Sequence, residues 1–146
     1  TLPYDACSLG FPPQLIRRIY GASKIYDTRS GIDPLFPETL LKDNELLSLV
    51  KVGEEFGTTT GRMRKTNWLN LDKLISAVKI SGTTIIIISK VDVIKKINIY
   101  KLYHNSNLLS FDTFTEMKKY INTVLKENSN LLDEIIYSDT AELTIL

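Results

Sequence analysis

The stretch NLDKLISAVKISGTTIIIISKVD, residues 70–92, decides the fold of this chain. Asn70 is a preferred helix N-cap residue and Gly82 a common helix terminator, so a helix is predicted between them. Its apolar side chains recur at helical spacing on one face: Leu71, Leu74, Ile75 and Val78. Residues 83–91 are then apolar and β-branched without alternation, which is typical of a strand buried on both faces. A helix that leads directly into such a strand indicates an α/β protein.

The flanking segments extend this pattern on both sides. Upstream, the predicted order is a loop over residues 1–13, a helix over 14–26, a loop over 28–39 and a short helix over 40–51. Downstream, it is a strand over 97–103, a helix that begins at Asp112 or Thr113, and a strand over 132–137. The inward residues of that last helix are Phe114, Met117, Ile121 and Leu125. The sequence therefore predicts an α/β fold with a largely parallel sheet flanked by helices, and ligands in such sheets gather at the carboxyl ends of the strands.

Composition excludes several functional classes. The 146 residues suffice for one domain with a real core, because 43% of them are hydrophobic. Charged residues make up 24% and nearly cancel to a net charge of +1, which argues against a nucleic-acid partner. The longest apolar run, residues 85–88, is far shorter than the ~20 residues of a membrane helix, so no membrane partner is expected. Cys7 and His104 are the one cysteine and the one histidine, which argues against a disulfide framework or a zinc site and favours a reducing cytoplasm.

The segment FGTTTGRMRK, residues 56–65, has the composition of an anion-binding loop. Its glycines let the backbone approach a ligand closely, and its threonine hydroxyls and exposed amides can donate hydrogen bonds. Arg62 and Arg64 add forked donors suited to a carboxylate or a phosphate. No Gly-Lys-Ser/Thr ending follows at the required spacing, so the segment is not a Walker-type phosphate loop. The alternative is a solvated turn with surface arginines.

A second segment, SKVD at residues 89–92, follows the apolar strand. The Asp92 carboxylate can accept hydrogen bonds from N1–H and the exocyclic amine of guanine, while the aliphatic stem of Lys90 covers the face of the base. GTP-binding proteins use this Lys-x-Asp arrangement repeatedly. The alternative is a solvated strand end, because short motifs of this kind are common.

Taken together and in order, these segments resemble the adenylosuccinate synthetase family over essentially the whole chain. FGTTTGR and the following WLNL are similar to the family's F-G-A-T-T-G-R and G-W-L-D, and AVKISG at residues 77–82 to its A-V-R-I-N-G. SKVDV at residues 89–93 resembles T-K-L-D-V, and KIYDTRSG at residues 24–31 resembles K-A-Y-x-T-R-V-G. ELTIL at residues 142–146 is similar to the family ending T-E-T-M-I-L. Residues 1–146 are thereby identified as the C-terminal portion of such an enzyme.

The resemblance implies a P-loop-NTPase-like synthetase fold whose N-terminal half is absent from this sequence. Members of the family join IMP and L-aspartate, coupled to hydrolysis of GTP, in the purine pathway that makes AMP. GTP would then be a substrate, and Mg2+ would be bound by residues outside this chain. A homodimer in the cytoplasm is expected by the same resemblance.

By position, the resemblance places an aspartate loop at residues 57–65 and a guanine-recognition strand end at residues 89–93. The backbone at Ser30 and Gly31 would approach the ribose of IMP, and Arg62 would also reach IMP. The full set implied for aspartate and IMP is Ser30, Gly31, Thr58, Thr59, Thr60, Gly61, Arg62, Met63 and Arg64. The set implied for GTP is Arg64, Lys90, Val91, Asp92, Tyr137 and Ser138.

Several positions depart from the family pattern. Met63 replaces a basic residue, Ser30 a valine and Asp33 a glycine, with an additional residue at Leu35. A small Ser-Thr-Gly element becomes YSD at residues 137–139, which predicts a reshaped guanine pocket.

No residue of this chain is assigned a catalytic or a metal-binding role. The resemblance puts the phosphate loop G-D-E-G-K-G, with its base and magnesium ligand, and the catalytic histidine upstream of Thr1, while His104 is expected to be structural or on the surface. The chain alone is therefore expected to be inactive. Two alternatives stay open: the short link over residues 93–112 also fits phage-type enzymes that act on dGMP, and the chain could be a catalytically dead guanine-nucleotide-binding module.

Overall fold

A computed structural model of the chain describes residues 2–34 and 36–139. Its α-helices are α1 (Leu2–Ser8), α2 (Asn44–Gly53), α3 (Leu71–Ser81), α4 (Val91–Ile97) and α5 (Phe114–Asn128), and its 3-10 helices are η1 (Pro13–Leu15) and η2 (Glu38–Lys42). Its strands are β1 (Tyr20–Lys24), β2 (Tyr26–Arg29), β3 (Lys65–Asn70), β4 (Ile85–Ser89), β5 (Tyr100–His104), β6 (Asn107–Phe111) and β7 (Glu134–Tyr137). The additional residue at Leu35 and the family-like ending at residues 142–146 lie outside the described residues.

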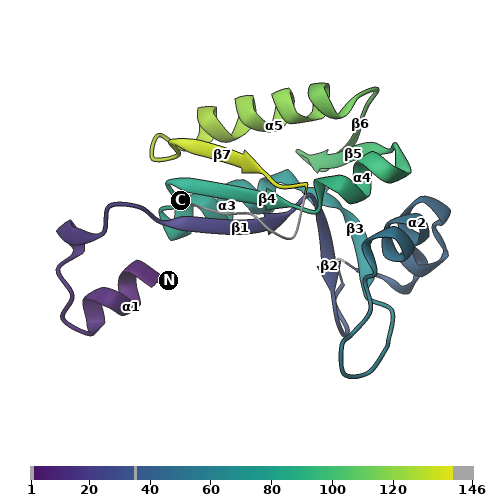
Figure 1. The fold of residues 1–146 in the computed structure, drawn as a ribbon, viewed down its shortest axis with the longest axis horizontal. Coiled ribbons are helices and arrows are strands. Elements are labelled where there is room, and N and C mark those ends of the chain that lie inside the picture. The colour runs from purple at the N-terminus through teal and green to yellow at the C-terminus, as the bar shows by residue number, and fades with distance from the viewer. Residues whose placement is uncertain (1, 35, 140–146) are drawn as a thin grey trace.

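The strands form two sheets. The first has the order β1-β4-β7 and is parallel throughout, with the isoleucine-rich strand β4 in the centre. The second has the order β2-β3-β5-β6, in which β3 and β5 are parallel and the two outer pairs are antiparallel. Figure 1 shows α5 lying along β7, and α2 and α4 beside the second sheet. The predicted α/β class, with a parallel sheet flanked by helices, is confirmed.

The helix and strand of residues 70–92 form as their sequence predicts. The Asn70 side chain caps α3 by accepting a hydrogen bond of 3.0 Å from the backbone N–H of Lys73. Gly82 ends the helix in the left-handed region at a φ of 65°, and β4 begins at Ile85. The predicted inward face of α3 is buried: Leu71, Leu74, Ile75 and Val78.

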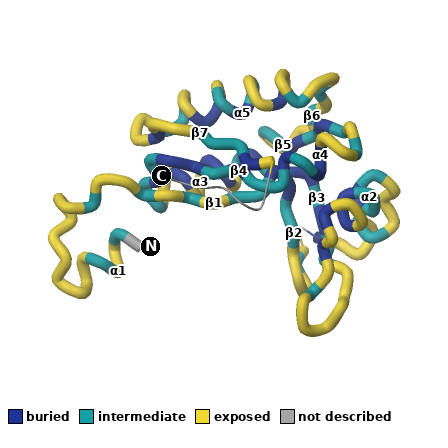
Figure 2. Tube along the Cα trace, viewed as in Figure 1, coloured by how far each residue is buried: buried dark blue, intermediate teal, exposed yellow. Residues whose placement is uncertain are grey.

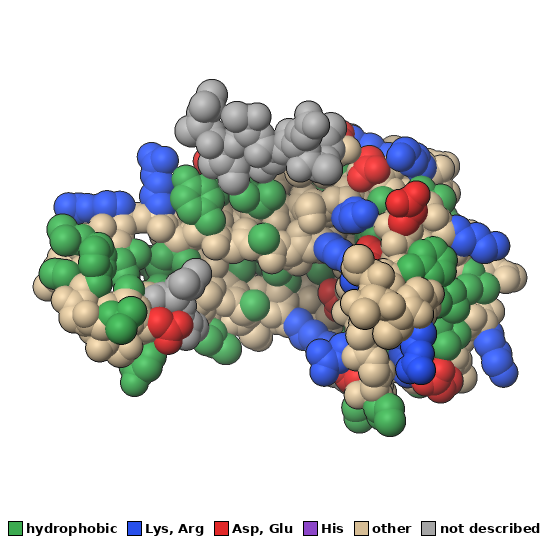
Figure 3. Space-filling model, turned by 60° about the horizontal axis from the view of Figure 1, so that its bottom comes forward, with side chains coloured by type: hydrophobic (Ala, Val, Ile, Leu, Met, Phe, Trp, Pro, Cys, Tyr) green, Lys and Arg blue, Asp and Glu red, His purple; other side chains and the backbone are tan. Residues whose placement is uncertain are grey.

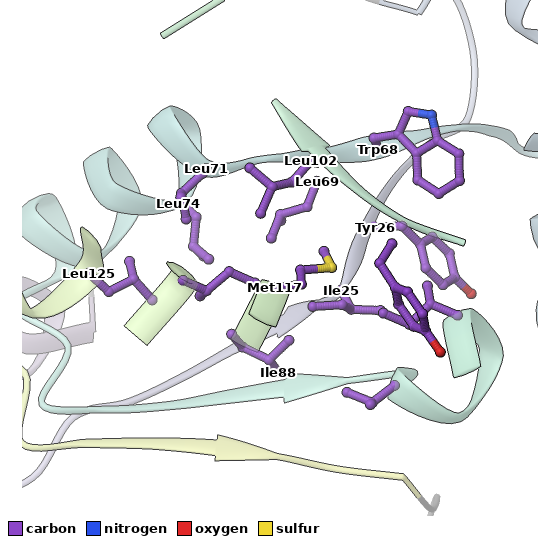
Figure 4. Close-up of a cluster of buried hydrophobic side chains, with 14 of the residues drawn as sticks. Ile25, Tyr26, Trp68, Leu69, Leu71, Leu74, Ile88, Leu102, Met117 and Leu125 are labelled. Carbon is purple, nitrogen blue, oxygen red and sulfur yellow. The ribbon is translucent and has the colours of Figure 1, made fainter. Parts of the chain in front are cut away.

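The core lies between the first sheet and the two helices α3 and α5. Figure 4 shows Leu71 and Leu74 from α3, Met117 and Leu125 from α5, and Ile88 from β4 in one apolar cluster. Each of these side chains is at most 8% exposed. Figure 2 shows that the exposed parts of the trace lie on the outer side of α5, in the N-terminal segment and in the loop before β3. Among the described residues, no helix combines the length and the hydropathy that crossing a membrane requires.

Helix α5 also begins where the sequence predicts. The Thr113 hydroxyl accepts a hydrogen bond of 3.2 Å from the backbone N–H of Glu116 and so caps the helix. Met117, Ile121 and Leu125 are buried as expected. Phe114, at the start of the helix, is only half-buried, and its ring lies against that of Tyr100 at a centroid distance of 6.4 Å.

The prediction of a helix over residues 14–26 is wrong. The structure has a short 3-10 turn there, then strand β1, and then strand β2 from Tyr26. Strand β1 pairs in parallel with β4, with Tyr20 opposite Ile85. Helical spacing of apolar residues is overridden here because the edge of β4 offers backbone partners that a helix would leave unpaired.

Residues 91–97 form the helix α4, where a link between strands is expected from the sequence. Lys90 adopts a φ of 64° and turns the chain into that helix, so Asp92 lies in a first helical turn rather than at a strand end. The next strand accordingly begins at Tyr100 rather than at Ile97. The buried side chains of the helix are Val91, Val93 and Ile94, and α4 packs against α2. So short an apolar run does not distinguish a helix from a strand by its period.

The remaining differences concern boundaries and one missed strand. Helix α1 occupies part of the expected loop over residues 1–13, and β2 takes the start of the loop over 28–39. Strand β6, which the sequence pattern does not reveal, forms a hairpin with β5. The helix expected over residues 40–51 is present as α2, whose N-terminus is capped by Asp43 through hydrogen bonds of 2.9 and 3.1 Å. The strand expected over 132–137 is confirmed as β7.

Replacing the cap of α3 tests this account of the fold. We expect Asn70→Ala to lower the free energy of unfolding by about 1 kcal/mol, because the Lys73 N–H loses its acceptor. Asn70→Ser, which keeps a side-chain oxygen at the same place, should recover most of that loss. Urea unfolding followed by circular dichroism measures both, and equal stability of Asn70→Ala and the wild type would contradict the capping role.

Candidate functional site

A buried carboxylate, Glu55, lies at the centre of the candidate site. Its side chain is 2% exposed and accepts three hydrogen bonds, from Lys24 Nζ at 2.7 Å, Tyr26 OH at 2.9 Å and Arg64 NH1 at 3.1 Å. The three donors come from the end of β1, the start of β2 and the segment before β3. A single side chain therefore connects the junction of β1 and β2 to the segment that surrounds the loop before β3.

The electrostatics of this cluster keep Glu55 ionised. Burial by itself would raise the pKa of the Glu55 carboxyl, but the hydrogen bonds from Lys24, Tyr26 and Arg64 and the Lys24 charge outweigh it and hold the pKa below its ordinary value of 4.5. Burial, and next the hydrogen bond to Glu55, raise the pKa of the Tyr26 phenol. Tyr26 thus remains a neutral donor to a permanent anion.

The residues between Glu55 and β3 form a hairpin-like loop, residues 56–64, which we call the threonine loop. Its base is closed by an antiparallel bridge between Phe56 and Met63 and by a hydrogen bond of 2.8 Å from Gly57 N–H to the Arg62 carbonyl. Gly61 adopts a φ of 62°, which favours glycine. A Cβ at Gly57 would stand 2.9 Å from the Thr60 hydroxyl, so close packing at the base also needs glycine. Thr58, Thr59 and Thr60 are exposed at the tip.

A cleft of about 470 Å³ lies between the threonine loop and the segment after β2. Its lining residues are Arg29, Ser30, Gly31, Ile32, Glu38, Leu41, Gly57, Thr60, Arg62, Met63 and Lys65. The structure thus brings Ser30 and Gly31 together with Thr60 and Arg62, as a shared substrate site requires. Figure 3 shows Lys and Arg side chains gathered around this end of the molecule.

Two of the cations that line the cleft are paired with acids beside it. Arg29 Nε lies 3.1 Å from the Asp33 carboxylate, and Lys65 forms an ion pair with Glu38. Such partly exposed pairs contribute little stability and exchange readily with a ligand anion. Arg29 and Lys65 could therefore bind a carboxylate or a phosphate of a ligand, and each is paired with an acidic side chain while the cleft is empty.

The residues expected to recognise guanine lie near the carboxyl ends of β4 and β7, with Val91 and Asp92 in the first turn of α4. The ends of β1, β4 and β7 are joined by hydrogen bonds of 3.0 Å from Ile25 N–H to the Ser89 carbonyl and 2.9 Å from Ser138 N–H to the Ile88 carbonyl. Lys90 follows β4, and its Nζ donates at 3.1 Å to the Gly53 carbonyl at the C-terminal end of α2, where a cation is favoured.

Asp92 and Tyr137 have partners of their own in this region. The Asp92 carboxylate lies 3.4 Å from Lys96 Nζ, one turn further along α4. The Tyr137 hydroxyl donates at 2.9 Å to the Asn122 side chain, and its ring packs edge-on against Phe114 at a centroid distance of 5.8 Å. Burial raises the pKa of Tyr137, so this residue stays neutral beneath α5. The Tyr137 side chain therefore packs against α5.

The structure brings together some of the expected site residues and separates others. Ser30, Gly31, Thr60, Arg62 and Met63 line the cleft, together with Gly57, whereas Thr58, Thr59 and Gly61 belong to the same loop but are not lining residues. The residues expected to contact GTP lie apart from the cleft: Lys90 and Ser138 follow β4 and β7, Tyr137 ends β7, and Val91 and Asp92 lie in the first turn of α4. Arg64 does not line the cleft and instead pairs with Glu55. Lys90 contacts Gly53, which precedes Glu55 by two residues in the sequence.

Sequence reasoning missed Glu55, Lys24 and Tyr26. The available signal was position: Glu55 directly precedes the threonine loop, and the other two residues lie in the KIYDTRSG segment, but nothing in the sequence shows that they meet. His104 lies apart from this cluster. Its Nδ1 is 2.6 Å from the Tyr120 hydroxyl and its Nε2 is 3.7 Å from the Asp72 carboxylate, which is a structural environment.

The sequence model of a family described as adenylosuccinate synthetase matches residues 1–130. The chain belongs to the adenylosuccinate synthetase family. The adenylosuccinate synthetase of Candida albicans is 46% identical over 88 residues, which are 60% of this chain and 20% of that protein. That of Yarrowia lipolytica is 42% identical over 105 residues, 69% of this chain and 24% of that protein. The chain thus spans about a fifth to a quarter of the length of these curated relatives.

A solved structure agrees with this assignment at the level of the fold. The structure described as a fully ligated adenylosuccinate synthetase from Plasmodium falciparum matches with a TM-score of 0.65 and 20% sequence identity. The match covers 92% of this chain and 40% of that one. The architecture of the chain is therefore that of one part of an adenylosuccinate synthetase.

Neutralising Glu55 tests the central cluster. We expect Glu55→Gln to lower the free energy of unfolding at neutral pH by about 1–3 kcal/mol, because the charged hydrogen bonds to Lys24 and Arg64 are lost. The loss is limited because both cations are partly exposed and keep some hydration. A carboxyl with a depressed folded pKa contributes stability above its ordinary pKa and loses it as the pH falls through the folded value. The wild type should therefore lose stability below a pH of about 4.5 more steeply than Glu55→Gln does.

The matched control is Glu54→Gln, since Glu54 is the exposed neighbour in sequence. Urea unfolding at neutral pH and at roughly pH 3 measures both variants. Parallel pH profiles for the wild type and Glu55→Gln, or an equal loss in Glu54→Gln, would show that Glu55 does not stabilise the fold as an anion.

Proposed function

We propose that this chain is the aspartate- and guanine-binding portion of a GTP-dependent ligase that joins IMP and L-aspartate to form adenylosuccinate. The observation that carries the proposal is the cleft in which Ser30 and Gly31 face the threonine loop with Arg62. Family membership supplies the reaction class, and the cleft supplies a place of suitable size and charge for two anionic substrates. The proposed setting is a cytoplasmic homodimer in AMP biosynthesis.

The threonine loop would bind aspartate by closing its tip. The base of the loop is fixed by the pairing of Arg64 with Glu55, whereas its hydroxyl-bearing tip is exposed and free to move toward a ligand. Thr59, Thr60 and the remaining donors of Arg64 would hold the two carboxylates, because a guanidinium carries five N–H donors. Closure excludes water and strengthens each of these charged hydrogen bonds.

The cleft arginine Arg62 would orient IMP rather than transfer protons. Its planar guanidinium suits a phosphate or a purine oxygen, and it remains charged at any working pH. The backbone at Ser30 and Gly31 would contact the ribose from the opposite wall. Arg62, Ser30 and Gly31 would thus position the substrate and neutralise its charge, as expected of a binding part of a synthetase.

Guanine would bind at the strand ends near Lys90 and Asp92. The Asp92 carboxylate would exchange its exposed partner Lys96 for the N1–H and amine of guanine, because an i, i+4 ion pair on a helix surface is worth only a few tenths of a kcal/mol. Val91 and Ser138, which are both buried, would lie behind the base and support it. Tyr137 would support it from below, since its hydroxyl already bonds Asn122.

The phosphate-transfer chemistry is proposed to lie outside this chain. Within residues 2–34 and 36–139, no three histidine, cysteine, aspartate or glutamate side chains gather to hold a metal ion. The proposal assigns Mg2+, the base and the catalytic histidine to an upstream part of the enzyme, because the family resemblance places them there.

Guanine recognition can be tested on the 146-residue chain itself. We expect GDP to shift the amide resonances of residues 89–93 in nuclear magnetic resonance spectra more strongly than ADP does. Asp92→Asn should weaken GDP binding by about 1.5–3 kcal/mol, since a charged hydrogen-bond acceptor is lost, and should favour xanthosine diphosphate, whose O2 accepts from the new amide. Asp112→Asn, another carboxylate of the chain, serves as the control, and equal responses to GDP and ADP would refute the guanine site.

The cleft assignment is tested by titrating IMP in the same way. IMP should shift the amide resonances of residues 29–31 and 57–62. We expect Arg62→Ala to lower the affinity obtained from these shifts by about 2–3 kcal/mol, the scale of a lost charged hydrogen bond. Arg17→Ala changes an exposed arginine outside the cleft and should leave the response intact. Titration with dGMP decides the phage-type alternative, because stronger shifts with dGMP than with IMP would reassign the substrate.

A further inference from the structure

A second cavity, of about 180 Å³, lies where the second sheet meets the N-terminal end of α3, and we call it the α3 cavity. Its lining residues come from β2, β3, β5, α3 and the segment before η2. The polar ones are Asp27, Asn67, Asn70, Lys73 and Tyr103, and the apolar ones are Phe36 and Trp68. None of them lines the cleft beside the threonine loop, so the α3 cavity is a separate place on the molecule.

Asp27 and Lys73 bring opposite charges to the α3 cavity without pairing. The Lys73 charge acts on the Asp27 carboxyl, yet none of the ion pairs found among the described residues joins the two. One Asp27 oxygen accepts from the Asn70 N–H at 3.3 Å, and Lys73 Nζ lies 5.6 Å from the centroid of the Phe36 ring. The other Asp27 oxygen and the Lys73 ammonium have no hydrogen-bond partner in the part of the chain that the structure describes. An acid and a base held apart across one small space suit a ligand that carries both charges.

The two asparagines that line the cavity contribute hydrogen-bond donors. Asn67 Oδ1 accepts from the Trp68 N–H at 2.9 Å, and Asn70 Oδ1 accepts from the Lys73 N–H at 3.0 Å. Because each side-chain carbonyl is used in this way, the group that each asparagine has left is its NH2, which can only donate. Neither NH2 group, nor the Tyr103 hydroxyl, has a hydrogen-bond partner among residues 2–34 and 36–139. These donors are available to the carboxylate of a ligand.

The size of the cavity limits the ligand to a small molecule. Phe36 is 5% exposed and Trp68 4%, so both are fixed by the packing around them and form a rigid boundary. The volume of about 180 Å³ is below the roughly 300 Å³ at which sites for drug-sized ligands begin. A nucleotide is therefore too large, whereas an amino acid with a short side chain fits.

The Asp27 carboxylate is only partly compensated by the protein. Burial raises the pKa of the Asp27 carboxyl, and the hydrogen bond from Asn70 and the Lys73 charge oppose that rise without cancelling it. A ligand ammonium beside the second Asp27 oxygen would replace part of the hydration that this carboxylate has lost. The electrostatics of the cavity thus favour a cationic group at Asp27 and an anionic group at Lys73.

We propose that the α3 cavity binds the zwitterionic head of a small free α-amino acid. Asp27 and the Tyr103 hydroxyl accept from its ammonium, while Lys73 and the NH2 group of Asn70 donate to its carboxylate. The family pattern does not imply this site, because Asp27 occupies the open position of K-A-Y-x-T-R-V-G and Asn67 that of the glycine in G-W-L-D. The proposal goes beyond the proposed function and does not depend on it.

Titration of the 146-residue chain with glycine, the smallest α-amino acid, tests the proposal. We expect glycine to shift the side-chain amide resonances of Asn67 and Asn70 in nuclear magnetic resonance spectra, together with the backbone amides of residues 67–73. Methylammonium and acetate each carry only one of the two charges, so each should bind at least tenfold more weakly than glycine. Asp27→Asn and Lys73→Gln should each lower the affinity for glycine at least tenfold, because each removes a charged hydrogen bond.

Two control variants keep the result specific. Asp112→Asn and Lys126→Gln change exposed charges outside the cavity and should leave the affinity for glycine unchanged. Asparagine at position 27 keeps an oxygen for the Asn70 N–H, and Lys73 is exposed, so both test variants should fold, which circular dichroism checks. The comparison of glycine with methylammonium and acetate needs no variant at all.

Four outcomes would overturn the proposal: no response of the Asn67 and Asn70 side chains to glycine, equal affinity for glycine and for either half of it, shifts confined to the threonine loop, or unchanged affinity in Asp27→Asn. Shifts confined to the threonine loop would place the amino acid in the cleft instead. The GDP and IMP titrations report on residues outside the α3 cavity, so their failure would refute the proposed function and leave this site standing.

Discussion

The fold and the candidate site both depend on how the buried charge of Glu55 is satisfied. A carboxylate this deeply buried costs several kcal/mol unless donors replace the water it has lost. Lys24, Tyr26 and Arg64 provide that replacement, and in doing so they fix the exit of β1, the entry of β2 and the base of the threonine loop relative to one another. These contacts hold the base of the threonine loop, whose residues form one wall of the cleft.

The same cluster lies close in sequence and structure to both the threonine loop and the α2 terminus that Lys90 contacts. Arg64 extends the cluster toward the threonine loop, and Lys90 contacts the last carbonyls of α2 just before Glu55. Both contacts place a charged group at Glu55 itself or within two residues of it in the sequence.

The fold corresponds to one part of a solved adenylosuccinate synthetase. Its parallel sheet has a covered centre in β4, yet β1 presents an open edge, and the segment before it, residues 2–19, exposes apolar side chains. Open strand edges and exposed apolar side chains are features that isolated domains usually protect.

Segments whose structure is local could be predicted from residue types alone. Asn70 and Gly82 delimit α3, Thr113 caps α5, and the β-branched isoleucine run favours a buried strand, because caps and hydrophobic patterns act over a few residues. The loop motif and the Lys-x-Asp motif likewise name the family from residue types alone. Tertiary structure decided the rest: residues 20–24 became a strand because β4 offered an edge, Asp92 entered a helix because α4 packs on α2, and Glu55 gained its role because residues far apart in sequence converge on it. Such choices depend on partners that no local pattern encodes.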